Sequence, residues 1–287
     1  MTYRITHSLR YDYDPAVILN PQEIRLQPRA DAYQSLNGFS LEVTPSPLGQ
    51  TLTVDELGNL VTRCWWSPQP ISALHIVAQS DVSTHCRNPF SYLLASQATH
   101  LPIDYPRSQL LSLFPYLDDS QDSLTAGPSV IAWAQELLTA CEFNTVEFLD
   151  RLNQTIYSQW TYQAREQGPA YPASVTWKNR QGSCRDFVVL FMAACRAVGL
   201  ASRFVSGYEE GSPELEQTLH AWAEVFLPGA GWRGYDPTLG LAVCDRHIAL
   251  AAHRFPHLTV PVLGTYQGQT NEILTTHVAI GRLGETS

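Results

Sequence analysis

The chain of 287 residues carries 27 acidic and 18 basic residues, a formal net charge of −9, and 44% of its residues are hydrophobic. This composition is that of a folded protein, and an acidic chain without a basic run is not expected to bind nucleic acid or an anionic membrane. The first residues lack the apolar core of a signal peptide and no apolar run is long enough to span a bilayer, so we expect a cytoplasmic protein.

Residues 1–88 are predicted to form an antiparallel β-sandwich domain. Segments in which apolar and polar residues alternate, such as TYRITHSLRYDY and ISALHIVAQSDV, are separated by breaks rich in Pro, Gly and Asn. Residues 89–127 contain four prolines and a polar acidic stretch, which is typical of a linker with one helical turn inside it. This linker is predicted to lead into a second domain over residues 128–287.

The second domain is predicted to begin with helices and to continue as an antiparallel sheet. Apolar residues at helical spacing follow Pro128, and Thr145 is suited to cap a second helix. A third helix is predicted from Cys184 to Val198, ended by Gly199. Three strand-like segments, ASRFVSGY, TLHAWAEVFL and WRGYDPTLG, follow it. Helices followed by strands indicate an α+β fold.

Cys184 differs from the other five cysteines in its setting. It follows Gly182 and Ser183 as the first residue of an apolar helix, where free backbone N–H groups and the helix dipole stabilise a thiolate. Cys195 lies on the apolar stripe of the same helix and is predicted to be a core residue. The six cysteines have irregular spacing and no C-x-x-C pair, so we expect reduced thiols and not a disulfide scaffold.

A thiolate nucleophile needs a base, and the base needs a group that orients it. His220 and Asp236 lie on consecutive predicted strands that are joined by a hairpin. If residues 226–230 form a five-residue loop, His220 lies directly opposite Asp236 and both side chains share one face of the sheet. A turn centred on residues 228–231 would instead put them on opposite faces. The sequence therefore predicts the five-residue loop and a triad of Cys184, His220 and Asp236.

No metal and no cofactor are expected. His247, His253 and His257 come at spacings of six and four residues. Pro256 stands between the last two and disfavours the helix that a two-histidine metal motif requires. The chain also has no P-loop, and no glycine-rich dinucleotide motif follows a strand.

Three blocks of sequence resemble the core of the transglutaminase-like superfamily, in its branch of bacterial transglutaminase-like proteins and cysteine proteases. In chain order they are GSCRDFVVLFMAACRAVGLASRFVSGY, HAWAEVFLPGAGWRGYDPT and RHIALAAHRFPHLTVPVLGTYQG. DELGN in the first domain is similar to the bacterial N-terminal β region that accompanies this core. The resemblance covers most of the chain. It implies a papain-like fold with Cys184 as nucleophile, His220 as general base and acid, and Asp236 as the residue that orients the imidazole.

The residues that would contact the substrate are less well defined. One oxyanion donor is expected to be the backbone N–H of Cys184, and the second has several candidates that could equally be packing residues. A further tryptophan, two residues beyond His220 on the same strand face, would shield the imidazole from water or belong to the core. These substrate-binding candidates are Trp160, Trp177, Gln181 and Trp222.

Together these features predict acyl transfer through a thioester on Cys184. The thiolate would attack an amide carbonyl of a peptide or protein substrate, and His220 would protonate the departing amine. Resolution by water would make the protein a hydrolase, which we favour because no calcium-binding loop is visible. Resolution by an amine would make it a transglutaminase or an arylamine-type acyltransferase. The alternative that is not an enzyme is a binding module with an idle active site.

Overall fold

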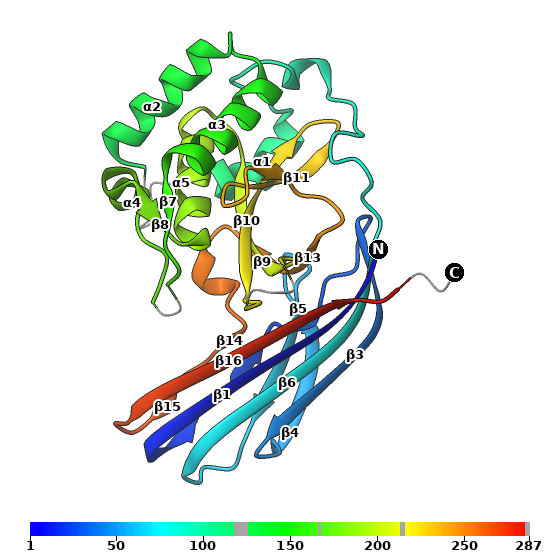
Figure 1. Cartoon of the computed structure of the whole chain (residues 1–287), viewed down its shortest axis with the longest axis vertical. Helices are drawn as coiled ribbons and strands as arrows, with labels where there is room; N and C mark the ends of the chain where they lie inside the picture. The colour runs from blue at the N-terminus through cyan, green and yellow to red at the C-terminus, as the bar shows by residue number, and fades with distance from the viewer. Residues whose placement is uncertain (118–125, 166–167, 213–215, 285–287) are drawn as a thin grey trace.

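The computed structural model describes residues 1–117, 126–165, 168–212 and 216–284. It has two parts (Figure 1). The first is a sandwich of two antiparallel sheets, and the second is a separate antiparallel sheet, called the second sheet below, on which a layer of helices packs. The predicted α+β fold, with an N-terminal β-sandwich and a papain-like core, is confirmed. In the described part of the chain, no helix has the length and apolar character needed to cross a membrane.

The sandwich follows from the alternation of apolar and polar residues in its strands. In the longest strand, the side chains of Tyr3, Ile5 and Leu9 point inward and are buried against Leu74 and Ile76 of a neighbouring strand. One sheet consists of β1 (Thr2–Leu19), β3 (Gln34–Thr44), β6 (Ile71–Thr84), β15 (Tyr266–Gln267) and β16 (Asn271–Arg282). The other consists of β2 (Gln22–Ile24), β4 (Gly49–Val54), β5 (Leu60–Trp65) and β14 (Val262–Leu263).

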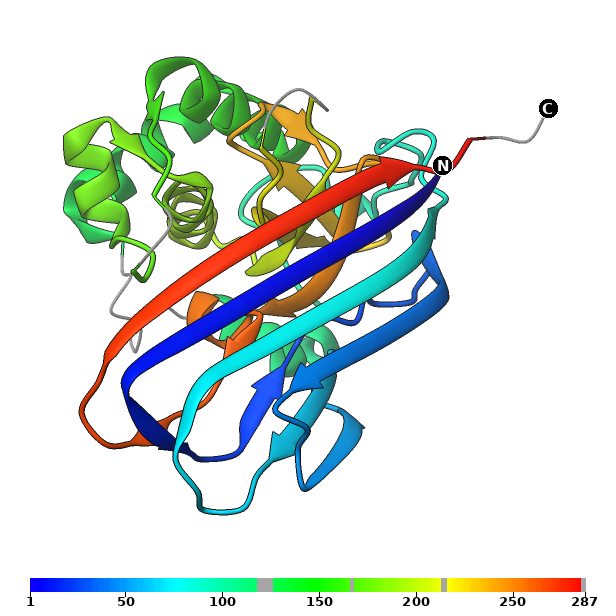
Figure 2. The ribbon, with the colours of Figure 1, turned by 60° about the horizontal axis from the view of Figure 1, so that its bottom comes forward.

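The C-terminal strand belongs to this sandwich and not to the second part of the chain. β16 runs antiparallel to β1 from the pair Tyr3↔Arg282 to the pair Asp14↔Asn271, and the two strands lie side by side in Figure 2. The prediction that residues 128–287 form one domain is therefore wrong at its C-terminal end. β1 pairs with β6 along one edge, and β16 satisfies the backbone groups of the other edge, which would otherwise be exposed.

The segment predicted as a linker contributes to the second core. It contains η1 (Ser96–Ala98) and α1 (Arg107–Leu117), a helix longer than the single turn expected. Its side chains at Leu101, Ile103 and Tyr116 are buried in the cluster that underlies the helices. Residues 118–125 of the predicted linker lie outside the described residues. Pro89 and Pro102 lie at a turn and a bend, and Pro106 directly precedes α1, where a proline is tolerated. Pro115 lies inside α1, in its last turn.

In the described residues of the second part, four helices lie over one face of a five-stranded sheet. The helices are α2 (Gly127–Ala140), α3 (Thr145–Gln159), α4 (Ala173–Asn179) and α5 (Cys184–Ala197). The sheet has the order β12-β11-β10-β9-β13, formed by β9 (Ser202–Glu209), β10 (His220–Leu227), β11 (Gly231–Asp236), β12 (Leu241–Ala242) and β13 (His247–His253). Shorter elements are β7 (Thr161–Tyr162), β8 (Gln181–Gly182) and η2 (Pro256–Leu258).

Helix α5 is the central element of this part. Its residues from Asp186 to Cys195 are all buried, and Ala221, Ala223 and Val225 of β10 lie in the same core. The predicted helix over residues 184–198 and the core position of Cys195 are thus confirmed. The predicted cap of α3 is wrong by one residue. The side chain of Asn144 accepts the hydrogen bond from the Glu147 N–H, and Thr145 is buried.

Two amide side chains from the sandwich hold the outer edge of β13. The Gln34 amide accepts from the backbone N–H of Ala249 at 2.7 Å and donates to its carbonyl at 2.9 Å. The Asn59 amide makes the same pair of bonds to Ala252, at 2.8 and 3.0 Å. Each amide thus takes the place of a neighbouring strand at this edge. Asn59 is the last residue of DELGN, so this motif joins the sandwich to the second sheet.

Candidate active site

The first turn of α5 fixes the position of Cys184. Ser183 precedes the helix, and both its backbone N–H and its hydroxyl donate to one carboxylate oxygen of Asp186 at 2.8 Å. The other oxygen of Asp186 accepts from Arg165 at 2.6 Å and from the Tyr171 N–H at 2.7 Å. Asp186 has no solvent exposure. This network ties the loop before α4 to the helix start, so the half-buried Cys184 thiol is held at the positive end of the helix.

His220 and Asp236 share a hydrogen bond at the ends of β10 and β11. The His220 Nε2 lies 2.6 Å from the Asp236 Oδ2, and the aspartate is fully buried. The predicted five-residue loop is wrong, because Leu227 pairs with Gly231 across a three-residue turn. In this register Trp222, not His220, lies opposite Asp236. The observed and predicted registers differ by two residues, and a shift of two keeps every side chain on its face.

The charges of this pair reinforce one another. Burial alone would lower the pKa of His220, but the Asp236 carboxylate and then the Cys184 thiol outweigh it and hold that pKa well above its usual value. Burial raises the pKa of Asp236, but its hydrogen bonds and charge interactions with His220 and His247 leave that pKa far below the usual range. Because Nε2 of His220 is bound to Asp236, Nδ1 is the nitrogen that remains for the thiol.

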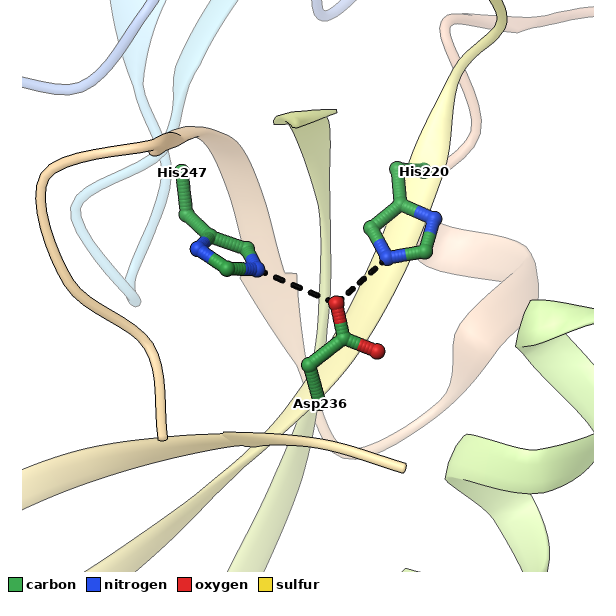
Figure 3. A group of neighbouring side chains, drawn as sticks. All are labelled: His220, Asp236 and His247. Atoms are coloured by element: carbon green, nitrogen blue, oxygen red, sulfur yellow. Dashed lines mark hydrogen bonds and ion pairs between the residues drawn. The ribbon is translucent and has the colours of Figure 1, made fainter. Parts of the chain in front are cut away.

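A second histidine, which the sequence did not identify as part of this group, binds the same aspartate. The His247 Nε2 lies 3.0 Å from the Asp236 Oδ2, so both imidazoles approach one oxygen (Figure 3). Its side chain is 2% exposed, and the Trp222 ring lies edge-on to it with centroids 5.2 Å apart. The run HIALAAH indicates a strand, but no sequence pattern states that its first residue, His247, lies within reach of Asp236. His247 is thus placed to orient Asp236 from the side away from His220.

The donor atoms of His220, Asp236 and His247 lie within 4.8 Å of one another, a grouping that could also hold a metal ion. Both Nε2 atoms, however, are at hydrogen-bonding distance from one carboxylate oxygen. Each would have to give up its proton and that bond to become a ligand. The arrangement therefore suits a hydrogen-bonded relay better than a cation site.

Tyr162 is a further neighbour of the thiol that the sequence did not identify. It pairs with Gly182, two residues before Cys184, in the parallel bridge of β7 and β8. A Cβ on Gly182 would lie 2.8 Å from the Asp186 Cβ, so only glycine fits at this crossing. Burial and then the charge of Cys184 raise the pKa of the Tyr162 phenol, while the residue is still 51% exposed. Tyr162 is thus partly exposed and interacts electrostatically with the thiol.

The four predicted substrate-binding residues have different surroundings in the structure. The indole N–H of Trp160 donates to the Thr176 carbonyl at 3.1 Å, so it is not free to bind an oxyanion. Trp160 and Trp177 pack together 5.5 Å apart, and the Arg180 guanidinium lies over both rings. Trp160 and Trp177 therefore have a packing role. Trp222 is 1% exposed and contacts His247, which places it in the core behind the histidines. Gln181 is exposed on β8, and its role as a donor stays a prediction.

Comparisons with known proteins agree with this architecture. Residues 131–237 match the model of the transglutaminase-like superfamily, and residues 3–83 match that of the bacterial transglutaminase-like N-terminal region. An uncharacterised protein of Mycobacterium tuberculosis is 28% identical, over 97% of this chain and 92% of its own length. An uncharacterised protein of Mycobacterium leprae is 22% identical, over 98% of both chains.

Among solved structures, a protein of Cytophaga hutchinsonii described as a candidate cysteine protease has a similar fold. The TM-score is 0.75 at 18% sequence identity, and the match covers 100% of this chain and 92% of that one. A likeness at this identity supports the fold alone. The two family models together span more than half of the chain, in the order that the fold requires. The chain thus carries a core of the transglutaminase-like superfamily at residues 131–237, preceded by the bacterial transglutaminase-like N-terminal region at residues 3–83.

Proposed function

We propose that the protein is a cysteine-dependent acyl-transfer enzyme that forms a thioester on Cys184 and resolves it with water. The observation that carries this proposal is the His220 imidazole, which lies 2.6 Å from a buried carboxylate and interacts with the Cys184 thiol. A base oriented by a carboxylate beside a sulfur at a helix N-terminus is the arrangement that activates a thiol nucleophile.

Each residue has a role in the proposed reaction. The Cys184 thiolate attacks the carbonyl carbon of a peptide amide, and the backbone N–H of Cys184 donates to the developing oxyanion. The Tyr162 hydroxyl is the second donor that we propose, in place of Trp160. The His220 imidazolium then protonates the departing amine, and the neutral imidazole takes a proton from the water that cleaves the thioester. Asp236 and His247 keep the imidazole in the orientation that these transfers need.

Hydrolysis is favoured over transfer to an amine because the open side of the site, by which we mean the partly exposed Cys184 thiol and its half-exposed neighbour Tyr162, gives water access to the acyl group. A transferase must exclude water from the acyl-enzyme, since water competes with the amine acceptor. The open side thus supports a peptidase or amidase, and the two acceptors can be separated by experiment.

An activated ester provides a test that does not depend on the natural substrate. Incubation with p-nitrophenyl acetate should give a burst of one p-nitrophenol per chain, followed by steady turnover. Digestion with trypsin should place the acetyl group on the peptide QGSCR, residues 181–185, which contains no other cysteine. Cys184→Ala should abolish both, whereas Cys86→Ser, a change at another half-buried thiol, should not.

The acceptor is identified by adding an amine to the same reaction. We expect free acetate to remain the product when glycine methyl ester is added at millimolar concentration. An amide product would instead indicate an acyltransferase. If Cys184 is never acylated while the native protein is fully folded, the proposed function is wrong and an idle binding module becomes the better account.

A further inference from the structure

Two cysteines far from Cys184 in the sequence lie next to each other in the structure. Cys86 comes two residues after the end of β6 in the sandwich, and Cys244 lies in the loop between β12 and β13. Their sulfur atoms are 2.9 Å apart, and the Cys244 sulfur is also 3.1 Å from the Cys86 carbonyl oxygen. They are 158 positions apart in the chain. The pair therefore bridges the two parts of the molecule.

The surroundings of the pair give small reagents access to it. Both side chains are partly exposed, whereas Cys64, Cys141 and Cys195 are buried. Cys86 and Cys244 also line a cavity of about 60 Å³ between the second sheet and the start of the predicted linker. All six cysteines are free thiols in the structure. A partly exposed pair of thiols whose sulfurs are in contact is the arrangement from which a disulfide forms with the smallest movement.

We propose that Cys86 and Cys244 are an oxidisable pair that forms a disulfide between the sandwich and the sheet that carries His220 and Asp236. The co-reactant is a low-molecular-weight disulfide such as oxidised glutathione. The Cys244 thiolate attacks one donor sulfur, and the donor S–S bond breaks to release one glutathione thiolate. The Cys86 thiolate then attacks the mixed disulfide at Cys244 and releases the second glutathione thiolate. Two protein thiols are oxidised, the donor is reduced, and the two protons end on the released thiolates.

The order of the two steps follows from the contacts of Cys86. Burial, and then the hydrogen bond and charge of Cys244, raise the pKa of Cys86 to about 12. A thiol with so high a pKa is a poor first nucleophile near neutral pH. Once Cys244 is bound in the mixed disulfide, its hydrogen bond and charge no longer act on Cys86. The proposed order thus has Cys244 as the attacking thiol and Cys86 as the resolving one.

The cross-link would fix the segment that supports His247. The Cys244 carbonyl accepts from the His247 backbone N–H at 3.2 Å, and the next strand is the one held by Gln34 and Asn59. A disulfide that closes so long a loop restricts the unfolded chain strongly. We expect the oxidised protein to have a Tm about 5–10 °C higher than the reduced protein. The irregular cysteine spacing hides this pair because the fold alone brings the two residues together.

The test is a disulfide map of the purified full chain in a Cys184→Ser background, which removes the competing nucleophile. The protein is incubated with oxidised glutathione, blocked with N-ethylmaleimide and digested with trypsin without reduction. We expect the peptides 64–87 and 234–246 to appear joined, with a mass lower by two hydrogen atoms than their sum. Reduction should separate them and reverse the gain in Tm.

Cysteine variants identify which two residues form the disulfide. Cys86→Ser and Cys244→Ser should each abolish both the joined peptides and the gain in Tm, whereas Cys141→Ser, at a buried thiol in the helical layer, should retain both. Cys86→Ser is needed because the peptide 64–87 also contains Cys64. Joined peptides that persist in Cys86→Ser would overturn the proposal. So would unreacted thiols, or glutathione adducts on Cys244 that never resolve into a cross-link.

Discussion

Replacing Asn59 by alanine tests how the sandwich supports the active-site sheet. The Asn59 amide is fully buried and bonds both the N–H and the carbonyl of Ala252. It also accepts from Arg29 at 2.7 Å and donates to Asp55 at 2.8 Å. Alanine would leave the two backbone groups of Ala252 buried without partners, at a cost of about 1–3 kcal/mol each. We therefore expect Asn59→Ala to lower the free energy of unfolding by about 2–6 kcal/mol, a large part of the stability of an ordinary domain.

Urea unfolding followed by tryptophan fluorescence measures this change. Asn37→Ala is the matched control, since Asn37 is exposed and donates a single hydrogen bond to the Ser83 hydroxyl. The control should stay within about 0.5 kcal/mol of the native protein. If Asn59→Ala is as stable as the control, the amide does not hold the edge of β13, and the role given to DELGN is wrong.

Three further changes probe the site itself. Asp236→Asn should lower the free energy of unfolding at pH 7 by about 1.5–3 kcal/mol per charge-assisted hydrogen bond lost. The same contact depresses the folded-state pKa of Asp236 and raises that of His220, so the ionised pair stabilises the native protein most between the unfolded values of about 3.9 and 6.5, and the difference in urea unfolding should be larger at about pH 5 than at about pH 8; a difference that shrinks between pH 8 and pH 5 would refute this. His247→Ala should slow the alkylation of Cys184 and His247→Gln, which keeps an N–H donor for Asp236, should recover most of the rate; equal rates in the two variants would exclude a positioning role. Tyr162→Phe should reduce turnover of p-nitrophenyl acetate by about 10²–10³-fold and leave the alkylation rate within about twofold, as expected of an oxyanion donor, whereas unchanged turnover would assign the second donor elsewhere.

The elements that the sequence predicted well are those with a strong local signal. The apolar stripe of α5, its start at Cys184 after Gly182 and Ser183, and the alternating strands of the sandwich are each encoded within one continuous segment of the chain. The shared face of His220 and Asp236 was also predicted, although the turn was not. Side-chain direction in a strand depends only on whether a residue is odd or even, so an error of two in the register leaves it unchanged.

The features that the sequence missed depend on contacts between distant segments. β16 completes the first sheet although more than 250 residues separate it from most of β1. His247 reaches Asp236 although β9 and β10 lie between β13 and β11 in the sheet. Tyr162 lies near the thiol because β7 pairs with β8. Trp160 was a reasonable donor by position, but only the fold reveals that its N–H is already bound to Thr176.

The pH dependence of Cys184 alkylation, in the native protein and in His220→Ala, tests the central claim most directly. Iodoacetamide labelling is followed by mass spectrometry of the peptide 181–185, which reports Cys184 alone. If Cys184 pairs with a protonated His220, labelling of the native protein should remain fast at about pH 6, and the variant should lose this fast labelling. A labelling midpoint near the free-thiol value of about 8.5 in both proteins would contradict the account, because Cys184 would then be an ordinary thiol.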